Sequence, residues 1–102
     1  ALAQGERAAA GLPAVLAAIN ERRVDVLLYE AGLTAPGYVC PDSGWLSVEP
    51  TSCPYGDGRA ERREQILEDA IAAALGQSAD VVALHDRPEL GPHGGIAALL
   101  RF

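Results

Sequence analysis

The chain has 102 residues, and 49% of them are hydrophobic, which suits one domain with a modest core. All eight basic residues are arginines, and fourteen acidic residues bring the net charge to −6 at neutral pH. This charge argues against general binding to nucleic acid or to an anionic membrane, because both attract clusters of basic residues. No apolar run approaches the roughly 20 residues that a membrane-spanning helix needs.

The first part of the chain predicts a helix followed by a strand. Residues 2–10 permit a helix but are too few to assign, and they lack the apolar core of a signal peptide. We expect the chain to be one domain of a longer protein, because it opens abruptly in this Ala-rich run. A helix is predicted over residues 12–21, with Pro13 in its first turn and apolar residues at helical spacing. Residues 24–29 predict a strand that is buried on both faces beyond Asp25.

The segment from Glu30 to Gly58 departs from this regular pattern. It contains five Gly, four Pro and both Cys, and this density of turn residues indicates an excursion from the main fold. The sequence Pro41–Gly44 is a good turn, so Val39 and residues 45–48 are predicted to form a small hairpin around it.

The last third of the chain predicts a helix and two strands. Apolar residues lie on one stripe of a helix over residues 61–75, with Asp57 able to cap its start and Gly76 suited to a left-handed residue just past its end. Strands are predicted over residues 80–85 and 96–102. Helices that alternate with buried strands indicate an α/β fold, and we expect an α-β-α sandwich with a mixed sheet.

The two cysteines resemble the remains of metal-binding knuckles. Cys40-Pro41 and Cys53-Pro54 look like two C-P-x-C-G motifs that each lack the second Cys. Structural zinc needs four ligands, so we expect no zinc and no other cofactor. The remaining alternatives are two free thiols close in space or a Cys40–Cys53 disulfide, and a cytosolic setting favours the reduced form.

The sequence offers no convincing catalytic group. His85 ends a predicted strand and His93 lies in the following loop, and we interpret both as surface residues. No nucleophile elbow, zinc-protease motif or phosphate-binding loop is present. The pair Gly94-Gly95 is best explained as a tight turn at the start of the last strand, where glycine permits a positive φ. We therefore expect no enzymatic activity.

Aromatic and basic residues around the excursion are the candidates for binding a partner. Tyr38 and Trp45 belong to the predicted hairpin, and exposed aromatic residues are favoured anchors of interfaces. The alternative for Trp45 is that it plugs a gap over the hairpin. An arginine cluster, formed by Arg59, Arg62 and Arg63, either contacts a partner or pairs with Glu61 and Glu64.

With these features, the chain resembles the C-terminal domain of the archaeal and eukaryotic class-I peptide chain release factors, and it looks closest to the bacterial branch of that superfamily. Four stretches carry the resemblance: residues 11–18, residues 23–28, the Cys-Pro pairs at Cys40 and Cys53, and residues 94–102. The closing G-G-I-x-x-x-L-R-F pattern is the most specific of them. The incomplete knuckles depart from the archaeal members of the family.

The resemblance implies one domain over residues 1–102, related in fold to the kink-turn-binding ribosomal proteins, with an inserted minidomain at about residues 38–58. In the family this domain contacts a translational GTPase and later a ribosome-recycling ATPase, in the cytoplasm. Stop-codon reading and peptidyl-tRNA hydrolysis belong to other domains. Gly94-Gly95 precedes Ile96, so it is not the hydrolytic Gly-Gly-Gln motif.

Three hypotheses for the function follow. The first is a non-catalytic docking domain of a release-factor-like protein that acts in translation termination or ribosome rescue, with a translational GTPase or a ribosome-associated protein as partner. The second is an RNA-binding module, by analogy with the related ribosomal proteins; the net charge opposes direct RNA binding. The third is a thiol redox switch that uses Cys40 and Cys53, which requires accessible thiols of low pKa.

Overall fold

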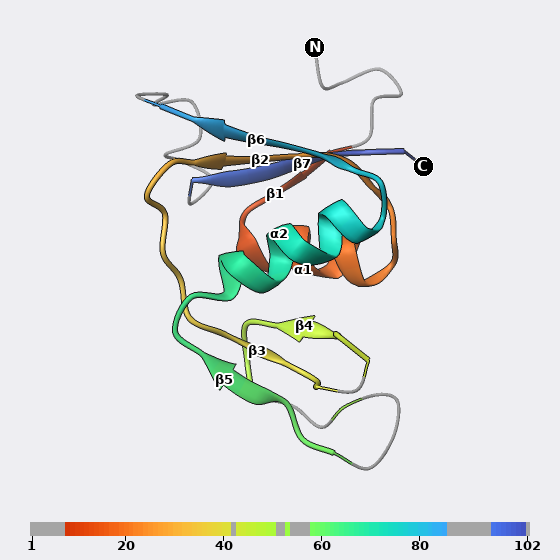
Figure 1. Cartoon of the computed structure of the whole chain (residues 1–102), viewed down its shortest axis with the longest axis vertical. Coiled ribbons are helices and arrows are strands. Elements are labelled where there is room, and N and C mark those ends of the chain that lie inside the picture. Colours follow the sequence, from red (N-terminus) through yellow and green to blue (C-terminus); the bar gives the residue numbers. More distant parts are fainter. Residues whose placement is uncertain (1–7, 42, 51–52, 54–57, 86–94, 102) are drawn as a thin grey trace.

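The computed structural model of the chain describes residues 8–41, 43–50, 53, 58–85 and 95–101 (Figure 1). The elements in chain order are β1 (Ala8–Ala10), α1 (Leu12–Asn20), β2 (Val24–Glu30), β3 (Gly37–Val39), β4 (Leu46–Ser47), β5 (Glu61–Arg63), α2 (Ile66–Gly76), β6 (Asp80–Leu84) and β7 (Ile96–Leu100). The predicted helix at 12–21, the strands that begin at residues 24, 80 and 96, and the hairpin are confirmed. Within these residues, no helix is both long enough and apolar enough to cross a membrane.

Four strands form the main sheet, in the order β1-β7-β2-β6. Strand β2 runs parallel to β6 and antiparallel to β7, and β7 runs antiparallel to β1, so the sheet is mixed as the sequence predicts. Leu27 of β2 lies at its centre, opposite Val81 of β6 and Ala98 of β7. The segment at residues 8–10, which the sequence left unassigned, is an edge strand because its backbone pairs with β7.

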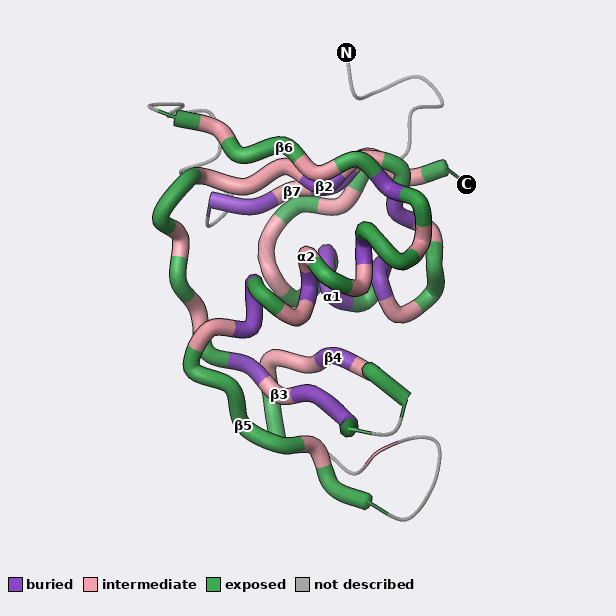
Figure 2. The backbone as a smooth tube through the Cα atoms, in the orientation of Figure 1, coloured by how far each residue is buried: buried purple, intermediate pink, exposed green. Residues whose placement is uncertain are grey.

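The helices and the two sheets form three layers. Both helices lie on the same face of the main sheet, and a small sheet of order β4-β3-β5 lies on their other side (Figure 1). Buried side chains from all three layers meet in one core, which includes Leu27 and Ile96 of the main sheet, Leu16 and Ile66 of the helices, and Leu46 of the small sheet. In Figure 2, buried residues occur in the main sheet, in both helices and in β3 and β4, whereas β5 is exposed. The α/β class, the mixed sheet and the inserted hairpin are thus confirmed. The α-β-α layer order is not, because both helices lie on one face of the main sheet, between it and the small sheet.

The outer face of the main sheet is less buried than the sequence predicts. Val26 and Leu28 of β2 are only partly buried, and Val82 of β6 is 39% exposed. Among the described residues, no helix covers this face, because both helices pack on the opposite one. The prediction that residues 24–29 are buried on both faces beyond Asp25 was therefore wrong.

Helix α2 begins five residues later than predicted. Glu61–Arg63 form strand β5, whose residues lie opposite Gly37–Val39 of β3 in an antiparallel register. Backbone pairing with β3 overrides the helix propensity of this charged stretch, since tertiary context commonly decides such cases. The N-cap is Gln65, whose side-chain oxygen accepts a hydrogen bond from the Leu67 N–H at 3.3 Å. Asp57, the predicted cap, precedes β5 and lies outside the described residues.

Both helices end with a left-handed residue that is not glycine. After α1, Arg22 has φ 59°, and after α2, Ser78 has φ 65°. In each case the left-handed residue and the one after it donate backbone hydrogen bonds to the last turn, which is the Schellman arrangement. Gly76, predicted to be the left-handed residue, is instead the last residue of α2. The motif therefore falls two residues later than the glycine indicated.

Two glycines are required by their surroundings. A Cβ atom on Gly37 would lie 2.6–2.7 Å from side-chain carbons of Ile66, so this glycine allows β3 to approach α2 closely. Gly95, just before β7, has φ +81°, and its carbonyl accepts a hydrogen bond from the Glu30 N–H at 2.8 Å. The predicted tight turn with positive φ is confirmed at Gly95, while Gly94 and His93 lie outside the described residues.

Candidate partner-binding site

The hairpin is held against α1 by the side chain of one asparagine. The Asn20 side-chain N–H donates to the Leu46 carbonyl at 2.8 Å, and its oxygen accepts from the Leu46 N–H at 2.8 Å. The amide therefore pairs with the outer edge of β4 as a neighbouring strand would. Leu46 itself is only 2% exposed and belongs to the core. These contacts fix the hairpin and the adjacent Trp45 relative to the C-terminal end of α1.

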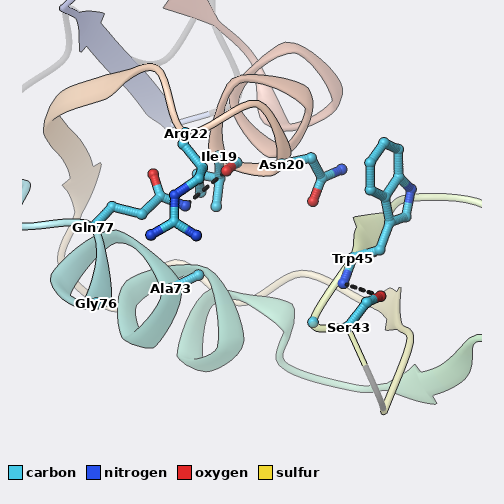
Figure 3. Close-up of a pocket in the computed structure, with 9 residues that line it drawn as sticks. Ile19, Asn20, Arg22, Ser43, Trp45, Ala73, Gly76 and Gln77 are labelled. Atoms are coloured by element: carbon cyan, nitrogen blue, oxygen red, sulfur yellow. Dashed lines mark hydrogen bonds between the residues drawn. The ribbon is translucent and has the colours of Figure 1, made fainter. Parts of the chain in front are cut away.

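A cleft of about 360 Å³ opens where the hairpin meets the ends of both helices. We name it the Trp45 cleft; its lining includes Asn20, Arg22, Trp45, Ala73 and Gln77. Figure 3 shows the indole beside the Asn20 side chain, while the Arg22 guanidinium points toward the C-terminal half of α2. The Gln77 side chain donates to the Ile19 carbonyl at 2.7 Å and so joins the two helix ends behind the cleft.

A second depression, of about 250 Å³, lies on the other side of Trp45. We name it the Pro13 pocket. Its floor is apolar, because it includes the buried Leu16 and Leu46, and its walls include the exposed Pro13 and Ala17 of α1 and the half-buried Val48. The two depressions share Asn20 and Trp45, so the indole borders both a cleft of mixed polar and apolar lining and a mainly apolar pocket.

The structure joins Cys40 and Cys53 in a disulfide, with their Cα atoms 5.7 Å apart. Cys40 is fully buried at the end of β3, and its backbone N–H donates to the Trp45 carbonyl at 2.9 Å. The carbonyl of Cys40 accepts from the Gly44 N–H, which closes the turn of the hairpin. The disulfide therefore anchors the same turn that presents Trp45. This oxidised pair differs from the reduced form that a cytosolic setting favours.

The predicted partner residues do not share one surface. In an antiparallel pair, residues directly opposite each other point to the same face. Val39 and Leu46 are opposite each other and buried against the helices. Tyr38 is therefore on the other face of the small sheet, opposite Arg62, whereas Trp45 lines the two depressions next to α1. The structure places these two aromatic residues at different sites.

The arginine cluster is largely paired with carboxylates. Arg63 lies 3.4 Å from Glu61 and 3.5 Å from Asp69 of α2, and Arg62 lies 3.9 Å from Glu64. Arg62 and Arg63 lie on β5. The sequence had predicted that they lie at the start of a helix. The alternative that the cluster pairs with Glu61 and Glu64 is confirmed for Arg62 and Arg63. Arg59 is exposed and makes an isolated backbone bridge before β5.

Sequence reasoning missed three amide side chains and one arginine that connect the elements. Asn20 and Gln77 act as described, and Gln65 donates to the Leu33 carbonyl at 2.8 Å and accepts from the Ala35 N–H at 3.2 Å. Arg101 donates to the carbonyls of Val24 and Gln77. An amide at each helix end was a usable signal, because such side chains satisfy free backbone groups there.

No catalytic or metal-binding constellation emerges in the described part of the chain. His85 is exposed at the end of β6, and His93 lies outside that part. Among the described residues, no three His, Cys, Asp or Glu side chains lie close enough together to hold a metal ion. The arrangement present there is a surface with an indole, an arginine and an apolar pocket, which are groups suited to binding a partner.

The chain is similar in structure to a translation protein. A solved structure described as the C-terminal domain of a peptide chain release factor from Methanosarcina mazei aligns with 93% of this chain and 70% of its own, at 26% sequence identity and a TM-score of 0.61. No protein-family model matches the sequence, and no curated protein matches it either. The comparison supports a release-factor-like domain, which agrees with the resemblance that the sequence shows.

Proposed function

We propose that this chain is a non-catalytic docking domain of a release-factor-like protein that acts in translation termination or ribosome rescue in the cytoplasm. The observation that carries the proposal is the similarity to a release-factor C-terminal domain over 93% of the chain. The incomplete Cys-Pro knuckles favour a place in the bacterial branch of the superfamily, where ribosome rescue is the best fit. The partner would be a translational GTPase or a ribosome-associated protein.

The geometry around Trp45 supports docking. Tryptophan and arginine are the residues most enriched among those that dominate binding energy in interfaces. Trp45 is half-buried between two depressions, and the exposed Arg22 lines one of them. The hairpin that carries Trp45 is fixed by the disulfide and by Asn20. A pre-positioned indole loses little conformational freedom on binding, which favours affinity.

The test is binding of the chain to purified ribosomes and to translational GTPases, measured by co-sedimentation and by titration. Truncating an interface tryptophan costs about 2 kcal/mol or more, so Trp45→Ala should weaken the association roughly 30-fold. Glu68→Ala is the matched control, because Glu68 is exposed on α2 and lines neither depression. Equal binding by wild-type chain and Trp45→Ala would place docking elsewhere, and no binding to any translation component would refute the proposal.

Direct RNA binding is the weaker alternative. The net charge is −6, and Arg62 and Arg63 each lie beside a carboxylate, which lowers their attraction for phosphate. A gel-shift series with a structured RNA should show no complex at moderate salt. A complex whose affinity falls steeply with salt would revive this alternative.

A thiol redox switch is favoured as a second function by one observation, the disulfide beside Trp45. Cys40 both forms the disulfide and donates its N–H to the Trp45 carbonyl, so reduction acts directly on the docking turn. The expected result is that a dithiol reductant weakens binding to the translation partner and that reoxidation restores it. Identical affinity of the oxidised and reduced chains would exclude the switch.

A further inference from the structure

The two depressions beside Trp45 adjoin each other, and we call the surface that they form together the groove; its two ends differ in chemistry. They share Asn20 and Trp45, so a bound chain that crosses the indole would reach both. The groove runs from the C-terminal end of α2 along α1 to Val48 after β4. A segment of extended polypeptide has the form to lie in it, with one side chain in each depression.

The Pro13 pocket selects an apolar side chain. Its floor is formed by Leu16, 1% exposed, and Leu46, 2% exposed. Pro13 and Val48 add apolar walls. The oxygen of Asn20 and one of its side-chain N–H groups already bond to the Leu46 backbone. A polar side chain would find few partners there, and burying it without partners is unfavourable.

The Trp45 cleft selects a carboxylate. Arg22 is exposed and lines the cleft, and no salt bridge involves it within the described residues. The neighbouring acid, Glu21, is already paired with Arg23 at 3.0 Å. Figure 3 shows the Arg22 guanidinium directed across the cleft toward α2, where a carboxylate could accept two parallel hydrogen bonds from it.

We propose that this groove binds an extended segment of a partner protein, with an apolar side chain in the Pro13 pocket and a carboxylate on Arg22. The inference rests on the proposed docking function and names its partner's chemistry. A second copy of the chain is the poorer occupant, because two chains of net charge −6 repel each other. The carboxylate belongs either to an Asp or Glu side chain or to the C-terminus of the segment.

The experiment selects ligands for the whole 102-residue chain from a library of random dodecapeptides, then measures synthetic peptides of the enriched sequences by titration. We expect an acidic residue within a few positions of a large apolar one. Replacing the Glu or Asp by Gln should cost at least tenfold in affinity if the side chain supplies the carboxylate. Amidating the peptide C-terminus should cause that loss instead if the terminal carboxylate does.

Variants of the chain test the contribution of each end of the groove to peptide binding. Ala17→Glu should abolish peptide binding, because Ala17 is exposed on α1 and lines the Pro13 pocket. Ala14→Glu is the matched control, since Ala14 is exposed on the same helix but outside both depressions, and should bind normally. Arg22→Gly suits the left-handed φ of 59° and removes the charge without disturbing the fold, so it should abolish the preference for the acid. Arg22→Glu should reverse that preference toward Lys peptides.

Several outcomes would overturn the inference: no enriched peptide, a preference of the wild-type chain for basic peptides, or peptides that bind Ala17→Glu as well as the parent. If the chain still binds ribosomes or a translational GTPase in that case, the docking function stands and uses another surface. If peptides bind as expected but no translation component does, the groove stands and the proposed function falls.

Discussion

The side chain of Asn20 hydrogen-bonds the hairpin to α1, so Asn20→Ala should destabilise the protein markedly. The substitution removes two hydrogen bonds of 2.8 Å and leaves the N–H and carbonyl of the buried Leu46 without them. Each hydrogen bond contributes about 1 kcal/mol net, and a buried group left unpaired costs more. We expect a loss of about 2–3 kcal/mol, a large part of the stability of a domain of this size.

The assay is urea denaturation followed by two signals. Trp45 is the only tryptophan of the chain, so its fluorescence reports on the hairpin, while far-ultraviolet circular dichroism reports on the helices. Asn20→Ala should lower the midpoint of both transitions, with the fluorescence change occurring first. Asn20→Asp keeps the acceptor but turns a carboxylate toward the Leu46 carbonyl, so it should be at least as harmful. The control, Glu21→Ala, loses only a surface ion pair. A loss below about 0.5 kcal/mol for Asn20→Ala would refute the reasoning.

Four further substitutions or treatments test the packing, each measured by the same denaturation. Gly37→Ala should cost about 1–3 kcal/mol because its Cβ would overlap Ile66, whereas Gly58→Ala, with open space around it, should be neutral; equal effects would contradict the close approach of β3 to α2. Ser78→Gly should stabilise by about 0.5–1 kcal/mol because Ser78 adopts φ 65°, and a loss of stability would count against the left-handed turn. Arg101→Ala should cost about 1–2 kcal/mol through its bonds to Val24 and Gln77, with Arg101→Lys between the two; an unaffected midpoint would exclude this bridge. Replacing Cys40 and Cys53 by Ser should cost about 3 kcal/mol, as expected for a loop of this length, and no change would show that the disulfide constrains little.

The regular elements were predictable because their signals are local. Helix α1 follows from apolar spacing and Pro13, and strands β2, β6 and β7 follow from apolar runs between turn residues. The hairpin follows from the turn at Pro41–Gly44. Strand β5 was missed because its charged residues have no strand pattern of their own. Its conformation comes from pairing with β3, whose partner residues lie 22–26 positions earlier, which no local window contains.

The candidate site was predictable only in part. Trp45 stands out by its residue type, but its position between two depressions depends on Asn20 and on the ends of both helices. Tyr38 was grouped with it because both belong to the hairpin, and the strand register places Tyr38 on the opposite face. Arg22 was not among the residues that the sequence predicted to bind a partner. Only the packing of α1 against α2 makes it the cation that lines the Trp45 cleft.

The most direct test of docking through this surface uses nuclear magnetic resonance of the ¹⁵N-labelled chain. The indole N–H of Trp45 gives the chain's single tryptophan side-chain signal, and it can be followed while a translational GTPase or ribosomes are added. We predict that this signal and the amides of Ala17 and Arg22 shift or broaden first, at the lowest partner concentrations. Binding that leaves these signals unchanged, and perturbs the outer face of the main sheet instead, would contradict the account.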